Sequence, residues 1–172
     1  MVPLTGSSQT LNPIRNITIR FATANHAEAI ASLLLESFVE YESLYTPEGF
    51  AATAITGDQI IARMSEGPVW VAVHEEDILG TVSVVAGAES LYIRGLAVLP
   101  AARSRGIGAL LLTHVEEFAR TEGFSRLFLS TTPFLDRAIR LYERFGFRRT
   151  SESPHELFGT PLFTMEKPSV AE

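Results

Sequence analysis

The residue types and spacing that could bind a phosphate group lie together in one segment, Arg103-Ser104-Arg105-Gly106-Ile107-Gly108. It follows an apolar run and leads into a predicted helix. The first N–H groups of a helix lack intrahelical partners, and the helix dipole adds partial positive charge there. The two glycines let phosphate oxygens approach the backbone, and arginine offers donors in a fork that suits phosphate. The segment therefore predicts an anion cradle.

Two common phosphate-binding motifs do not fit this segment. A dinucleotide-binding fold needs a third glycine where Leu111 stands, and it places the motif after the first strand. A Walker loop needs Gly-Lys followed by Ser or Thr, a combination that the chain lacks. The sequence therefore argues against NAD and ATP as the ligand.

Composition excludes several other kinds of chemistry. The 172 residues include no cysteine, which rules out disulfides, cysteine-ligated metals and a cysteine nucleophile. The four histidines lack metal-ligand spacing, so we expect no metal. A net charge of −6 argues against nucleic acid as a partner, and no apolar run is long enough to cross a membrane. Without a secretory signal, we expect a cytoplasmic protein.

Hydrophobic periodicity outlines one domain over residues 15–167, between a flexible lead-in at 1–14 and a tail at 168–172. The expected strands cover 17–21, 69–74, 78–86, 91–98, 127–130 and 162–166, with a hairpin at 154–161. The expected helices cover 25–38, 58–66, 106–122 and 132–144. Thr56 and Thr132 have the residue type and position of helix caps.

The order of these elements indicates the fold class. The strands at 91–98 and 127–130 are joined by a helix and form a parallel β-α-β unit, whereas hairpins precede them. We therefore predict an α/β (α+β mixed) fold. It has a single mixed, mostly antiparallel sheet with a central parallel strand pair and helices on both faces. Ligands in such sheets prefer the carboxyl ends of strands, where the cradle lies.

The pattern Arg103-x-x-Gly106-x-Gly108 resembles the acyl-CoA signature of the GNAT superfamily of acetyl-CoA-dependent N-acetyltransferases, [RQ]-x-x-G-x-[GA]. A second run, Ala138-x-x-Leu141-Tyr142-x-x-x-Gly146-Phe147, resembles a frequent companion of that signature. The resemblance covers about residues 17–167, because the element order matches as well. It implies a GNAT-like fold with acetyl-CoA as co-substrate.

The resemblance also implies where acetyl-CoA would bind. Its diphosphate would lie on backbone N–H groups of Arg103, Ser104, Arg105, Gly106, Ile107 and Gly108. Its pantetheine arm would pair with the strand backbone at Leu96, Ala97 and Val98, and a backbone N–H near Val98 would polarise the acetyl carbonyl. That strand is expected to splay from the strand that begins at Leu127, which admits the thioester.

The resemblance assigns Tyr142 as the general acid that protonates the departing thiolate. An unperturbed tyrosine, with a pKa near 10, is protonated at neutral pH; the alternative is a core tyrosine. Many relatives carry a glutamate on the central strand that acts as the general base. Residues 91–94 contain no glutamate, so Glu89, just upstream, is the candidate base. Proton removal through water, or by His74 or His155, stays open.

Glu40, Tyr41 and Tyr45 are the candidate acceptor-binding residues, in a loop where the family builds its acceptor pocket. Acidic and aromatic side chains suit a cationic amine, although a solvated acidic loop is the alternative. We expect acetyl transfer from acetyl-CoA to a primary amine of a small molecule or peptide, by direct attack in a ternary complex. The competing interpretation is a noncatalytic acyl-CoA-binding regulatory domain. Dimerisation is common in the family, so the resemblance makes a homodimer one possible state of this chain.

Overall fold

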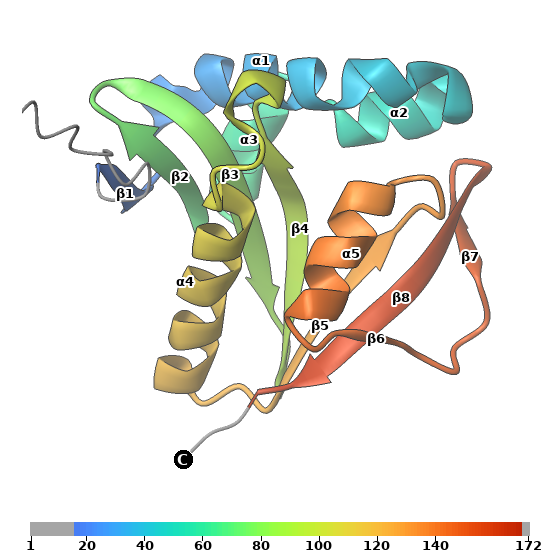
Figure 1. The fold of residues 1–172 in the computed structure, drawn as a ribbon. Helices are drawn as coiled ribbons and strands as arrows, with labels where there is room; N and C mark the ends of the chain where they lie inside the picture. Colours follow the sequence, from blue (N-terminus) through green and yellow to red (C-terminus); the bar gives the residue numbers. More distant parts are fainter. Residues whose placement is uncertain (1–15, 170–172) are drawn as a thin grey trace, which may run out of the picture.

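The computed structural model describes residues 16–169, so the lead-in predicted at 1–14 lies outside the described part of the chain. Eight strands of this part form the sheet on which the fold is built (Figure 1). Their bounds are β1 (Ile17–Phe21), β2 (Val69–His74), β3 (Asp77–Ala86), β4 (Ser90–Val98), β5 (Arg126–Thr131), β6 (Arg148–Arg149), β7 (His155–Leu157) and β8 (Thr160–Pro168). All the strands expected from the sequence are present, and β7 with the start of β8 forms the expected hairpin.

The strands lie in the order β1-β2-β3-β4-β5-β8-β6, and β7 pairs with the beginning of β8. Neighbouring strands are antiparallel except β4 and β5, which run parallel. This topology confirms the predicted fold class. The parallel pair lies near the middle of the sheet because α4 carries the chain from the end of β4 back to the start of β5.

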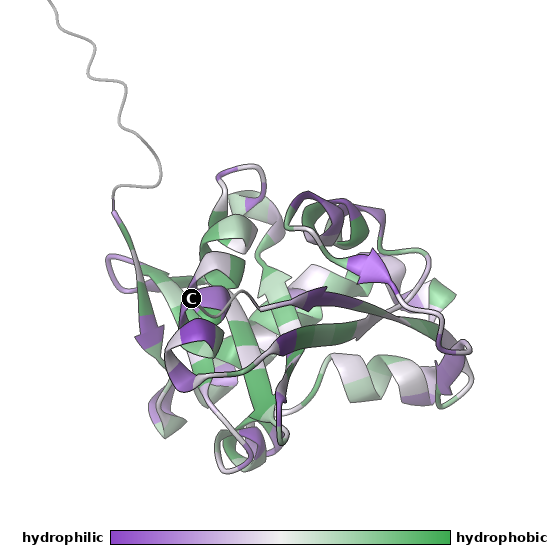
Figure 2. Cartoon of the chain, turned by 90° about the horizontal axis from the view of Figure 1, so that it is seen from below, coloured by the Kyte–Doolittle hydropathy of each residue, from purple (hydrophilic) through white to green (hydrophobic). Residues whose placement is uncertain are grey.

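Within residues 16–169, five α-helices cover the sheet: α1 (Ala27–Phe38), α2 (Pro47–Thr53), α3 (Gly57–Met64), α4 (Ile107–Glu122) and α5 (Asp136–Arg144). One hydrophobic core lies between the sheet and α4 and α5, and a second lies between the sheet and α1 and α3. Figure 2 shows the hydrophobic residues gathered on the central strands and the hydrophilic ones toward the periphery. None of the helices within residues 16–169 is long and apolar enough to span a bilayer.

The start of α5 corrects one sequence prediction. Thr132 does not cap this helix, because α5 begins at Asp136 with Leu135 as its N-cap. Thr132 instead opens a turn in which its carbonyl accepts a hydrogen bond from the Leu135 N–H at 3.3 Å. Pro133 therefore lies inside this turn and not at the first position of the helix. The Thr132 hydroxyl is buried close to the Tyr45 side chain.

Two other boundaries differ from the prediction. The segment with Glu40, Tyr41 and Tyr45, which we expected to be a loop, contains the 3-10 helix η2 (Val39–Leu44) and leads into α2. Thr46 caps α2, and its hydroxyl accepts a hydrogen bond from the Gly49 N–H at 3.0 Å. At the other end of the chain, the Ser169 N–H donates to the Ser125 carbonyl at 2.9 Å, so the fold continues past the predicted boundary at 167.

Truncation of a core residue on α4 tests the packing against the sheet. Leu111 is 0% exposed, so Leu111→Ala should lower the free energy of unfolding by about 2–5 kcal/mol. Leu35 on α1 is 50% exposed, and Leu35→Ala should cost less than about 0.5 kcal/mol. Urea denaturation followed by circular dichroism measures both, and equal losses would contradict the described core.

Candidate active site

The turn between β4 and α4 has the backbone conformation of an anion cradle. Ser104 (φ 66°) and Gly106 (φ 78°) both adopt the left-handed conformation, which glycine accepts without strain. Gly106 is the N-cap of α4 and has no side chain, so the first turn carries no side-chain cap. The N–H groups that open α4 therefore lack intrahelical partners. Ser104, Arg105 and Gly106 are all exposed, so a ligand can reach them.

Two glycines set the position of the helix start. A β-carbon at Gly108 would lie 2.8 Å from Leu141 Cδ2 on α5. A β-carbon at Gly80 on β3 would lie 3.0 Å from Ile107 Cγ2. Both distances are shorter than ordinary van der Waals contact, so a side chain at either position would have to displace Leu141 or Ile107. Gly108 thus serves helix packing, whereas Gly106 provides the turn.

The Arg103 side chain contacts the neighbouring helical segment. Its guanidinium forms an ion pair with Glu40 on η2, and Nη2 donates to the Ser37 carbonyl at 3.2 Å, at the end of α1. The Arg103 N–H donates to the Pro100 carbonyl at 3.3 Å, so the free backbone donors of the cradle begin only at Ser104. Glu40, which we predicted as an acceptor-binding residue, is instead engaged by Arg103.

The central parallel pair is incomplete, as the resemblance to the GNAT superfamily implies. β4 and β5 pair only over Ser90–Ile93 and Arg126–Leu129, and the two strands then separate (Figure 1). Just past this point β4 contains a bulge at Gly95 (φ 66°), where its register with β3 shifts by one residue. The edge of β4 from 94 to 98 has no partner on β5, and it includes Leu96, Ala97 and Val98.

Tyr142 projects from α5, which lies over β4 and β5 in Figure 1. The residue is 7% exposed, and its ring packs edge-on against Phe147 at 6.0 Å between centroids. Burial raises the pKa of the Tyr142 hydroxyl far above its usual value, and the nearby Tyr45 and Tyr92 hydroxyls raise it further. The hydroxyl is therefore protonated at neutral pH.

Two tyrosines, one in η2 and one at its C-cap, pack against the connection between β5 and α5. The rings of Tyr41 and Tyr45 lie 6.2 and 4.9 Å from the ring of Phe134. Tyr45 is 8% exposed, and burial raises the pKa of its hydroxyl, although the nearby Thr132 and Thr53 hydroxyls oppose that rise. Tyr45 also raises the pKa of the Tyr142 hydroxyl, so these two predicted site residues lie close together.

Residues 39–53, which we call the bridging segment, are attached to both halves of the sheet. On the β4 side, Glu40 pairs with Arg103. On the β8 side, the Thr46 N–H donates to the Thr160 hydroxyl at 2.9 Å, and the Thr46 hydroxyl donates to the Phe158 carbonyl at 2.8 Å. The segment therefore spans the region where β4 and β5 separate.

The structure brings only one of the candidate bases near this region. Glu89 lies in the turn before β4, at the end opposite Val98, which is roughly 26 Å away along a nine-residue strand. His74 ends β2, next to the edge strand. His155 on β7 lies with Nε2 3.3 Å from the Ser130 hydroxyl, one residue beyond the last β4–β5 pair.

Sequence reasoning did not assign a role to Tyr92 or Phe128. Their rings stack at 5.0 Å between centroids, on the paired part of β4 and β5 next to the separation. Tyr92 stands between the buried residues Leu91 and Ile93, and this alternation indicates that it faces away from the core formed with α4 and α5. That alternation is the signal that could have identified it.

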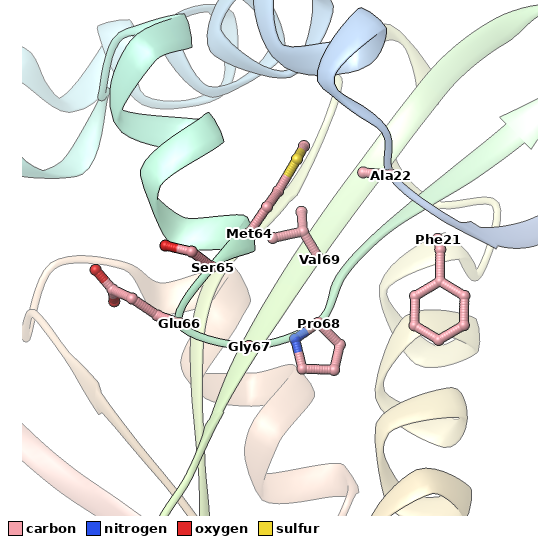
Figure 3. A pocket seen from close by; sticks show the side chains of 8 residues that line it. All are labelled: Phe21, Ala22, Met64, Ser65, Glu66, Gly67, Pro68 and Val69. Atoms are coloured by element: carbon pink, nitrogen blue, oxygen red, sulfur yellow. The ribbon is translucent and has the colours of Figure 1, made fainter.

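A surface depression of about 440 Å³ lies elsewhere on the molecule. Phe21 and Ala22 line it from the end of β1, and residues 64–69 line it from the α3–β2 connection (Figure 3). It shares no residue with the cradle or with the unpaired edge of β4. We therefore do not place the chemistry there.

Comparisons with known proteins agree with this geometry. The model of the acetyltransferase (GNAT) family matches residues 27–147. The uncharacterized N-acetyltransferase YjgM of Escherichia coli (strain K12) is 31% identical over 135 residues, which cover 75% of this chain and 80% of that protein. The PaiA N-acetyltransferase of Thermoplasma acidophilum, solved in complex with coenzyme A, has a TM-score of 0.76 at 18% identity and covers 88% of this chain and 98% of its own. YncA of Salmonella typhimurium, a putative acetyltransferase solved with acetyl-CoA, has a TM-score of 0.69 at 22% identity and covers 91% and 96%.

The chain belongs to the GNAT family of acetyltransferases. It is an acyltransferase enzyme of the N-acetyltransferase type, which confirms the family and the class of activity predicted from its sequence. The noncatalytic interpretation gains no support from these relatives.

Loss of the Glu40 carboxylate tests the attachment of the bridging segment. Glu40→Gln should speed amide hydrogen exchange at residues 39–45 several-fold, because it removes the ion pair with Arg103. The free energy of unfolding should fall by less than about 1 kcal/mol, since Glu40 is partly exposed. Glu42→Gln, at an exposed position of the same 3-10 helix, is the matched control. Unchanged exchange in Glu40→Gln would show that the ion pair does not hold the segment.

Proposed function

We propose that this chain transfers the acetyl group of acetyl-CoA to an amine of a small molecule or peptide, by direct attack in a ternary complex. The observation that carries the proposal is the adjacency of the cradle at 104–108 to the unpaired edge of β4 at 94–98. The cradle offers backbone donors to a diphosphate, and a strand edge offers hydrogen bonds to an extended amide-bearing arm. Coenzyme A or acetyl-CoA in two similar structures supports this donor.

The cradle residues fit a diphosphate in charge as well as in shape. Arg105 is exposed next to the uncapped start of α4, and its guanidinium can follow a phosphate oxygen. Arg103 does not bind phosphate through its side chain in this proposal, because its guanidinium is already paired with Glu40 and donates to the Ser37 carbonyl. It positions the turn and the bridging segment relative to each other.

The Tyr142 hydroxyl acts as the general acid. The amine nitrogen attacks the acetyl carbon and forms the new C–N bond, a backbone N–H on the edge of β4 stabilises the carbonyl oxygen, and the C–S bond then breaks. The sulfur receives the bonding electron pair and takes the Tyr142 proton, which solvent later replaces. The raised pKa of Tyr142 keeps this proton in place until the thiolate forms.

The amine also loses a proton, and His155 is the candidate that lies near enough to receive it through water. Its ring is exposed and approaches the Ser130 hydroxyl beside the separation of β4 and β5. Glu89 has no place in this proposal because it lies at the far end of β4. Tyr41 and Tyr45 support the acceptor region as aromatic walls against Phe134. A homodimer and a cytoplasmic location stay predictions.

A substitution at the cradle tests the donor site directly. Gly106→Asp places bulk and negative charge beside the proposed diphosphate, so affinity for coenzyme A should fall at least about 100-fold, as expected for several lost charge-assisted hydrogen bonds. The matched control is Gly123→Asp, because Gly123 ends the same helix in the same left-handed conformation (φ 81°) with open space around it. Isothermal titration calorimetry measures both variants. Equal affinities would mean that coenzyme A binds elsewhere.

Removal of the Tyr142 hydroxyl tests the general acid. Tyr142→Phe should lower kcat with acetyl-CoA by about 100-fold or more, while its affinity for coenzyme A changes little. The defect should shrink with an acetylated aryl thiol as donor, because a more acidic thiol leaves without a proton. Steady-state thiol release measures both donors. The same defect with both donors would indicate a packing role for Tyr142.

A further inference from the structure

A pair of arginines lies on the sheet face opposite α4 and α5, beside the bulge in β4. Arg63 comes from the last turn of α3, and a β-carbon at Gly95 would lie 3.0 Å from its Nη1 atom. Arg94 precedes Gly95 and forms an ion pair with Glu66, just beyond the end of α3. The two guanidinium groups are near enough for Arg94 to lower the pKa of Arg63, and they lie at the start of the unpaired edge of β4.

The charges of this group do not balance. Arg63 and Arg94 carry two positive charges, and Glu66 carries the one carboxylate paired with them. Among the contacts of residues 16–169, Arg63 has no ion pair or hydrogen bond, and Arg94 Nε is buried without a partner. Burial lowers the pKa of Arg63, and the neighbouring Arg94 lowers it further, so the unpaired charge is costly. A single negative charge would satisfy the group.

The arginine pair lies next to the place where we propose that acetyl transfer occurs. Tyr92 is close enough to raise the pKa of both the Arg63 guanidinium and the Tyr142 hydroxyl. The unpaired edge of β4 begins at Arg94, directly after the last β4–β5 pair at Ile93. An acceptor whose amine reaches the separation of β4 and β5 would therefore hold its neighbouring atoms near Arg63.

We propose that Arg63 and Arg94 bind a carboxylate of the acceptor, so that the acceptor is an amine with a carboxylate a few bonds from its nitrogen, as in an amino acid. This inference rests on the proposed function and names its acceptor class. A monoanion matches the single unpaired charge, and the forked guanidinium groups suit the two oxygens of a carboxylate. The engagement of Glu40 by Arg103 also removes the carboxylate first expected to select a purely cationic amine.

Matched pairs of acceptors test this inference. A panel of α-amino acids and their α-carboxamides is assayed for thiol release at saturating acetyl-CoA, with the wild type, Arg63→Gln, Arg63→Lys and the control Arg120→Gln. Arg120 is exposed on the last turn of α4, which packs on the opposite face of the sheet. The wild type should favour the acids over the amides in kcat/KM by roughly tenfold or more, as a charge-assisted hydrogen bond provides.

Arg63→Gln should abolish this preference without changing the KM of acetyl-CoA, whereas Arg120→Gln should retain it. Arg63→Lys, which keeps the charge and loses the fork, should give an intermediate ratio and guards against a folding defect of the glutamine variant. Equal use of acids and amides by the wild type, or an unchanged ratio in Arg63→Gln, overturns the inference.

A binding measurement separates this failure from failure of the proposed function. The melting temperature is measured with coenzyme A plus each N-acetylated amino acid or its amide, which needs no turnover. If no amine is acetylated but the N-acetylated acids raise the melting temperature only when Arg63 is present, the carboxylate site stands and the proposed transfer is wrong. If amides are acetylated as well as acids are, the transfer stands and the carboxylate site is wrong.

Discussion

The end of hydrogen bonding between β4 and β5 after Ile93 and Leu129 is the constraint on which the rest of the structure depends. In the middle of a sheet, backbone groups normally find partners on both sides, so the edge of β4 from 94 to 98 is an exception that needs another partner. The bulge at Gly95 adds to the divergence. The bridging segment then crosses the same region and joins the two halves of the sheet through Arg103 and Thr46.

The charges near this region have separate tasks. The start of α4 carries uncapped N–H groups and exposed Arg105, and this is where we propose that the diphosphate of acetyl-CoA binds. Arg103 belongs to the same sequence motif, but its ion pair with Glu40 connects the cradle to the bridging segment. On the other face of the sheet, Arg63 and Arg94 provide positive charge that Glu66 only half balances. Our two proposals therefore place two anionic groups at distinct positions in one domain.

Much of this arrangement was predictable from local patterns. The capping box of Thr56 and Gln59 marks the start of α3, and Gly123 marks the end of α4. The cradle was predictable because its free N–H groups follow from the start of a helix alone. The pairing of Arg103 with Glu40 was not, since these residues lie 63 positions apart in the sequence and meet only through the fold. Short helices such as α2, with seven residues, show too little periodicity to be recognised.

The sequence by itself determined the strands, the long helix α4, the donor motif and the family, because each depends on residues that are close in the chain and on periodic burial. Only the tertiary structure decided which charged residues are free to act. Glu40 and Arg103 neutralise each other, and Glu89 lies at the wrong end of β4. Within residues 16–169, Arg63 forms no ion pair, because Glu66 is paired with Arg94. The physical reason is that ion pairing and burial depend on distances between side chains that are remote in sequence, and sheet register sets those distances.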